Sequence, residues 1–130
     1  MFTEMMPMGG SSGSGSFNAV SDTKSDGARN TGITIDTGLD AVHKFVFIAV
    51  IQDSSKTYGV AVYDEDAYTD KQIVYANYGG NSYYSFPAFP TTGTSGVYPT
   101  INSISDGTVT VTYPNQGMTA GKGDYTWFAI

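Results

Sequence analysis

Few residues in this chain have the types and spacing that catalysis requires. The single histidine, His43, stands at the start of the apolar run 43–51 (HKFVFIAVI). A Ser-His-Asp triad would have to be built around this residue, but the chain has no Gly-x-Ser-x-Gly nucleophile turn. It also lacks a phosphate-binding glycine loop, a dinucleotide fingerprint and an HExxH zinc motif. We therefore expect His43 to be a strand-end residue, and we expect a protein without enzymatic activity or a cofactor.

One acidic cluster is a candidate cation site. It lies in the segment 64–71, DEDAYTDK, and contains Asp64, Glu65, Asp66 and Asp70. Calcium takes several oxygen ligands at defined positions, and this segment lacks the spacing and the glycine of an EF-hand loop. A solvated turn is the favoured interpretation, and a loop calcium site formed by Asp64, Asp66 and Asp70 is the alternative. Paired carboxylates also serve glycosidases, but no sequence signature of a substrate groove accompanies them.

Aromatic residues gather in the segment 75–89 and form the candidate ligand-binding site. Glycine, asparagine and serine lie between them, which is the composition of adaptable recognition surfaces. Flat aromatic faces also stack on sugar rings, so a host surface glycan is a candidate ligand. The alternative is that these rings pack on the sheet or at a subunit contact. The six residues are Tyr75, Tyr78, Tyr83, Tyr84, Phe86 and Phe89.

The first 16 residues predict an anchoring arm. Residues 9–16, GGSSGSGS, have the composition of a flexible tether. Methionine is flexible and polarizable, and it fills irregular apolar grooves well. A head rich in methionine on such a tether suits docking into a neighbouring protein, whereas a loose terminus with chance methionines is the alternative. The large apolar residues of this head are Met1, Phe2, Met5, Met6 and Met8.

Charge and composition exclude several classes of partner. The 130 residues contain 12 acidic and six basic side chains, for a net charge of −6, and no cysteine. Nucleic-acid binding depends on clustered lysine and arginine, and anionic lipid surfaces repel an acidic protein. Without cysteine there is no disulfide framework or thiolate metal site. The longest apolar run is too short to cross a bilayer, and the first residues lack the basic and apolar regions of an export signal. We expect a cytoplasmically made protein without membrane insertion.

From residue 17 onward, the pattern of apolar residues has period two, which is typical of β-strands. We expect no helix and about seven strands in a single β-sandwich domain over residues 17–130, Ig-like or jelly-roll-like, with a small barrel as the alternative. Asp106-Gly107 between two alternating runs predicts a two-residue hairpin. Polar or glycine- and proline-rich loops are expected at 21–32, 64–71, 82–99 and 114–124, of which 82–99 has room for one edge segment. The expected strands are 32–36, 43–51, 58–63, 73–78, 100–105, 108–113 and 125–130, with a short one at 17–20.

Two of these strands are apolar on both faces. The run 43–51 is apolar at almost every position, and in 125–130 Tyr125 and Trp127 alternate with Phe128 and Ile130. A two-layer sandwich covers only one face of each strand. The other face then needs the arm, a long loop or another subunit, so we expect a homo-oligomer.

Several segments resemble small β domains in tail, fibre and head-accessory proteins of tailed bacteriophages. They are 43–51, the Tyr-Gly strand at 58–63, NYGGN at 77–81, SISDGTVTVTY at 103–113 and GDYTWFAI at 123–130. The opening MFTEMMPM with its Gly/Ser run is similar to the start of short phage structural proteins of Gram-positive hosts. This resemblance, over roughly 32–130, implies a symmetric, non-enzymatic virion component.

The resemblance leaves the place of such a component in the virion open. The component that the resemblance implies is a head-decoration or tail/fibre module, and we expect it to bind other virion proteins, to assemble in the host cytoplasm and to be exposed on the particle. A receptor- or glycan-binding adhesin that uses the 75–89 segment is the alternative.

Overall fold

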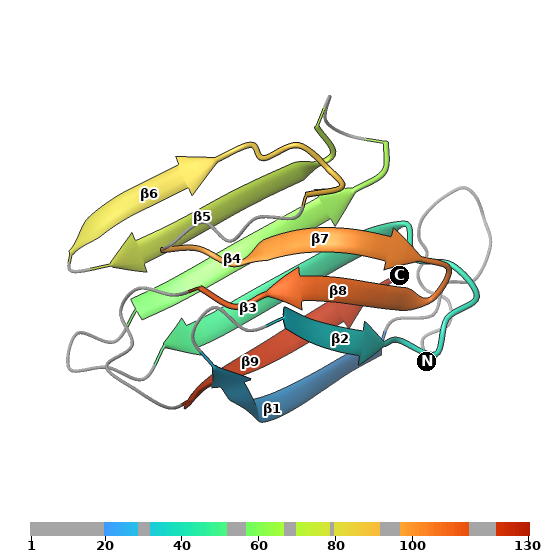
Figure 1. Cartoon of the computed structure of the whole chain (residues 1–130), viewed down its shortest axis with the longest axis horizontal. Coiled ribbons are helices and arrows are strands. Elements are labelled where there is room, and N and C mark those ends of the chain that lie inside the picture. The colour runs from blue at the N-terminus through green and yellow to red at the C-terminus, as the bar shows by residue number, and fades with distance from the viewer. Residues whose placement is uncertain are drawn as a thin grey trace, which may run out of the picture.

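The computed structural model describes residues 20–28, 32–51, 57–66, 70–78, 80–91, 97–114 and 122–130. All regular structure in these ranges is β-strand, and every strand pairing is antiparallel. The strands form a six-stranded sheet and a three-stranded sheet that pack against each other (Figure 1). The expected β-sandwich is therefore confirmed.

The six-stranded sheet has the order β1-β9-β3-β4-β5-β6. The consecutive strands β3, β4, β5 and β6 form a meander, in which each strand pairs with the next one in the chain. The last strand, β9, pairs with the open edge of β3, and β1 adds to the outer edge of β9. The bounds are β1 Val20–Ala28, β3 Lys44–Ile51, β4 Thr57–Asp64, β5 Gln72–Tyr78, β6 Asn81–Ser85 and β9 Lys122–Ala129.

The three-stranded sheet consists of β2 (Gly32–Asp36), β8 (Thr108–Thr112) and β7 (Thr100–Ser105), in that order. The turn Asp106-Gly107 joins β7 to β8, as expected, and Asp106 has a φ of 54°. Gly107 is needed for a different reason. A Cβ at this position would lie 1.9 Å from the Leu39 carbonyl oxygen, so only glycine lets the hairpin end approach the 37–39 backbone.

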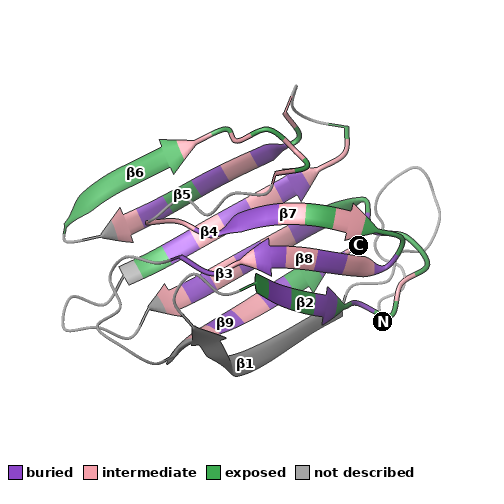
Figure 2. Ribbon diagram, viewed as in Figure 1, coloured by how far each residue is buried: buried purple, intermediate pink, exposed green. Residues whose placement is uncertain are grey.

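The core lies between the two sheets, where side chains of both alternate between buried and more accessible positions (Figure 2). Aromatic rings of the large sheet form its centre: Phe45 stacks on Trp127 at 6.0 Å between ring centroids, and Phe47 stacks on Tyr125 at 5.1 Å. The small sheet contributes β-branched residues, as expected for a half-buried strand. The buried apolar ones on β2, β7 and β8 are Ile33, Ile35, Ile101, Val109 and Val111.

Two buried polar side chains join the sheets. The Gln72 amide donates to the Ile101 carbonyl oxygen (3.1 Å) and accepts from the Ile101 N–H (2.6 Å), which ties β5 to β7. The Tyr113 hydroxyl lies within hydrogen-bond distance of the carbonyl oxygens of Val50 (3.1 Å) and Asp124 (2.7 Å). Burial, and the nearby Asp124 carboxylate, raise the pKa of Tyr113. Through these bonds, the two side chains contact backbone groups of strands in the other sheet, as buried polar groups commonly do.

Some expectations about the strands were wrong. The described residues contain nine strands where about seven are expected: the predicted loop 21–32 contains most of β1, and β6 occupies the edge segment allowed for within 82–99. Both are edge strands, at the two ends of the six-stranded sheet. A backbone ladder holds an edge strand without an alternating apolar pattern, so the sequence carried little signal for either one.

Candidate functional site

The most unusual surface of the molecule is the outward side of the six-stranded sheet. Strand register places outward residues opposite one another in rows that cross the sheet, because directly paired residues of antiparallel strands point to the same side. We call this surface the outer sheet face. One row is Phe128, Val46, Val62 and Ile73; the next is Thr126, Ile48, Val60, Tyr75 and Tyr84; the third is Asp124, Val50, Tyr58, Asn77 and Ser82.

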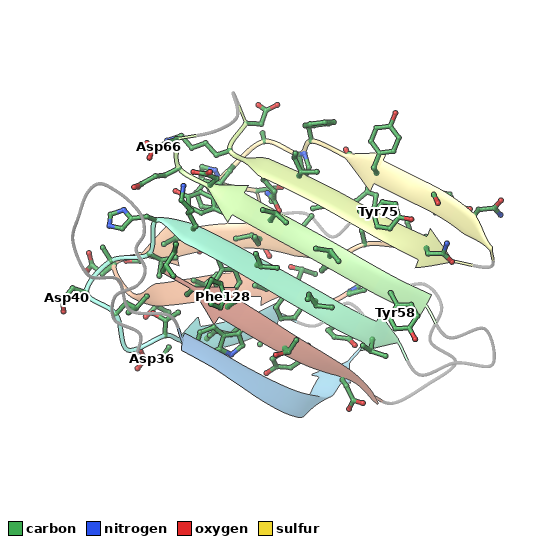
Figure 3. All side chains as sticks on the ribbon, turned by 180° about the vertical axis from the view of Figure 1, so that it is seen from behind. Asp36, Asp40, Tyr58, Asp66, Tyr75 and Phe128 are labelled. Carbon is green, nitrogen blue, oxygen red and sulfur yellow. The ribbon has the colours of Figure 1, made fainter. Side chains whose placement is uncertain are left out.

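No described segment packs over this face, which is seen directly in Figure 3 with Phe128, Tyr58 and Tyr75 labelled. Phe128 is 41% exposed and Tyr58 52%, whereas Phe47 on the opposite side of the sheet is fully buried. The aliphatic residues between them are intermediate in burial, since each is shielded only by its neighbours within the sheet. The face therefore presents contiguous apolar surface to solvent.

The outward side of the small sheet is the natural comparison. Its central strand, β8, points Thr108, Thr110 and Thr112 outward while Val109 and Val111 face the core. An antiparallel sheet with one solvated side normally shows this alternation of apolar inside and polar outside. The small sheet follows this rule and the large sheet departs from it. A face that only contacts solvent would be polar, so solvent exposure does not explain why the outer sheet face is apolar.

Charged groups of the face lie at its ends. Lys44 and Asp64, which are opposite each other on β3 and β4, form a salt bridge of 3.1 Å. The Asp66 N–H donates to the same Asp64 carboxylate at 3.0 Å, and this bond, with Lys44, lowers the pKa of Asp64. At the other end lies Asp124 on β9. Within the described chain, the first two rows contain no ionisable side chain other than tyrosine.

His43 and the acidic residues lie beside this charged end. The His43 ring nitrogen Nδ1 forms a hydrogen bond with Glu65 Oε2, and both groups are exposed. Among the described residues, no three His, Cys, Asp or Glu side chains lie close enough together to hold a metal ion. The carboxylate of Asp64 is already engaged by Lys44 and the Asp66 N–H. The geometry gives Asp64, Asp66 and Asp70 no shared centre.

The described aromatic residues of 75–89 lie at three different places in the structure. Tyr75 and Tyr84 are paired on the outer sheet face, and Phe86 contacts Tyr84 edge-on at 6.4 Å. Tyr83 is paired with the buried Ala76 and so lies on the other side of the sheet. Phe89 packs against Tyr63 at 4.6 Å, beside the core. The side chain of Tyr78 lies outside the described residues.

The predicted anchoring residues Met1, Phe2, Met5, Met6 and Met8 also lie outside the described residues. In the parts of the chain that the structure describes, no helix is long and apolar enough to cross a membrane.

No family model, curated protein or solved structure matches this chain.

Sequence reasoning identified part of the outer sheet face and missed the rest. It recognised that 43–51 and 125–130 are apolar on both sides. It did not include β4 and β5, although Tyr58, Val60 and Val62 alternate with Gly59, Ala61 and Tyr63 in the same two-sided way. The signal was present, but register was needed to show that these strands are neighbours.

Proposed function

We propose that this protein is a non-enzymatic structural module that joins a larger protein assembly through the outer sheet face. The observation that carries the proposal is the apolar surface on the outer side of the six-stranded sheet, over which no described segment packs. Large contiguous apolar patches are uncommon on monomeric proteins and mark interaction sites. Its composition, rich in valine, isoleucine and tyrosine with charges at the ends, matches the apolar core and polar rim of stable interfaces.

The resemblance of 32–130 to phage β domains supports a virion as the assembly. In this proposal the chain is a head-decoration or tail/fibre accessory module that assembles in the host cytoplasm and is then exposed on the particle. The arm that contains Met1, Phe2, Met5, Met6 and Met8 would bind another virion protein. The net charge of −6 is consistent with protein partners rather than nucleic acid.

A second candidate function is glycan or receptor binding, and one observation favours it. Tyr84 is 72% exposed and Phe86 50%, and the two rings meet edge-on beside the open edge of β6. Tyr75 lies next to them, with its hydroxyl 3.1 Å from Ser82 Oγ. Exposed rings with nearby hydroxyl and amide groups provide both stacking and hydrogen bonding to a sugar.

Sedimentation of the chain in lysates of cells that make the assembly tests the proposed function. We expect the wild-type chain to sediment with particles far larger than itself and Phe128→Glu to remain in the light fractions, because an unpaired carboxylate would be buried at the interface. Thr110→Glu, on the polar side of the small sheet, is the control and should sediment like wild type.

Tyr84→Ser separates the two candidates. If only this variant loses binding to host cells or to glycans, while Phe128→Glu still joins the particles, the second candidate replaces the first.

A further inference from the structure

The outer sheet face is large enough for a specific interface. Strands in a sheet lie about 4.8 Å apart and rise about 3.3 Å per residue, so six strands of five to nine residues make a face of roughly 25 by 25 Å. That is about 600 Å² on one molecule, or about 1,200 Å² if an equal surface covers it, which is the lower end of the range for specific, stable interfaces. A partner must therefore cover most of the face.

The shape of the face restricts the partner further. Three parallel rows of side chains cross the central strands, and the residues at their centre are Ile48 and Val60, both β-branched. A single helix would cover one stripe of such a surface, whereas a second sheet covers all rows at once. Stacked sheets lie about 10 Å apart with their side chains interdigitated. The best-fitting partner is another β-sheet with an uncharged, apolar side.

This molecule itself presents such a sheet. Resting on the proposed function, we infer that the partner on the outer sheet face is a second copy of this chain, with the same face of both copies stacked about a two-fold axis. A two-fold interface uses one patch twice, so the patch must be compatible with itself. The first two rows meet this condition because, in the described residues, no lysine, arginine, aspartate or glutamate would be buried against its own copy.

The ends of the face fit the same arrangement. Lys44 and Asp64 offset each other's charge through their 3.1 Å salt bridge, and the acidic residues Glu65 and Asp66 lie beyond this pair, outside the three rows. Asp124 lies in the third row at the opposite end. The stacked arrangement would bury Phe128, Val60 and Tyr75 and leave the threonines of β8 exposed.

Sedimentation velocity of the full chain tests this inference directly. We expect a wild-type mass of twice the 13.8 kDa of one chain. Phe128→Glu should sediment as a monomer, with a dissociation constant raised about 100-fold or more, since each dimer would bury two carboxylates without partners. Tyr58→Glu, at a 52% exposed position, should act in the same direction. Circular dichroism verifies that each variant is folded, and Thr110→Glu should remain a dimer.

A second full-length variant tests whether the outer sheet face is covered by another copy of the chain or by the methionine-rich head. The head substitutions Phe2→Ser, Met5→Ser and Met6→Ser should leave the dimer intact. Loss of the dimer in this variant, or a wild-type chain that is monomeric at every concentration tested, overturns the inference. A dimer that survives both Phe128→Glu and Tyr58→Glu in folded protein also overturns it. If the wild-type chain is monomeric and Phe128→Glu still fails to join particles, the inference fails while the proposed function stands.

Discussion

Tyr113 provides the most exact test of how the two sheets are held together. Its ring is fully buried and meets Phe47 edge-on at 6.3 Å. Its hydroxyl is close to the carbonyl oxygens of Val50 and Asp124, which are opposite residues of the β3–β9 ladder. A residue that follows the small sheet thus holds the end of a ladder in the large sheet. Tyr113→Phe removes this contact and leaves the ring in place.

The expected cost at neutral pH follows from the hydrogen bond alone. A buried hydroxyl hydrogen bond contributes about 0.5 to 1.5 kcal/mol to the free energy of unfolding, and a well-packed hydroxyl that lies near two carbonyl oxygens belongs in the upper part of this range. The ring volume hardly changes, so no cavity term is added. We expect Tyr113→Phe to lower the free energy of unfolding by about 1 to 1.5 kcal/mol at pH 7.

Alkaline pH should reverse the order of stability. Burial raises the pKa of Tyr113 in the folded protein, whereas the unfolded chain ionises near about pH 10. Below this unfolded value the stability from the neutral hydroxyl is fully present, and it is lost as the pH rises toward the folded pKa. At pH 11 this linkage removes about 1.4 kcal/mol from the wild type and nothing from Tyr113→Phe. The two curves should therefore cross near about pH 11.

Urea denaturation at a series of pH values measures this effect. Trp127, the single tryptophan, is 5% exposed and stacked on Phe45, so its fluorescence reports unfolding. The nine other tyrosines are shared by both proteins, so they cancel in the difference. Tyr84→Phe is the surface control and should lie within about 0.5 kcal/mol of wild type at pH 7. A difference between Tyr113→Phe and wild type that stays constant from pH 7 to about 11 would refute the linkage argument.

Two further substitutions test the packing between segments. Gly107→Ala should lower the free energy of unfolding by about 2 kcal/mol or more, because its Cβ would lie 1.9 Å from the Leu39 carbonyl oxygen and the backbone must move; thermal unfolding at an unchanged midpoint would contradict this. Gln72→Leu leaves both backbone groups of Ile101 without their amide partner and should cost at least about 2 kcal/mol in chemical denaturation. A Gln72→Leu protein as stable as wild type would show that other groups satisfy Ile101.

Substitutions between the sheets and substitutions on the outer sheet face should affect different quantities. Substitutions between the sheets, such as those at Tyr113 and Gln72, should change the unfolding free energy of the single chain. Substitutions at Phe128 or Tyr58 should change association first, because these side chains are 41% and 52% exposed in the isolated subunit. Measuring both quantities for each variant therefore separates folding from assembly.

Local patterns in the sequence were sufficient for much of the fold. The alternation of Val109 and Val111 with threonines predicts the buried side of β8, and Asp106-Gly107 predicts the hairpin. These features depend on residues close together in the chain, whose periodicity and turn preference are local properties. The same holds for the two-sided character of 43–51, which indicated that a second face required a partner.

Tertiary structure alone decided which residues form the candidate site. Phe128, Val46, Val62 and Ile73 come from four strands and form one row only because the register aligns them. Register also separated the aromatic residues of 75–89, placing Tyr84 on the outer sheet face and Tyr83 opposite it. Edge strand β1 was missed, and β6 was expected only as an edge segment within a loop, because neither sequence has the alternating apolar pattern of the other strands. Long-range backbone pairing leaves no periodic signature in the chain, and for this reason the sequence indicated two strands of the outer sheet face but not the rows that cross it.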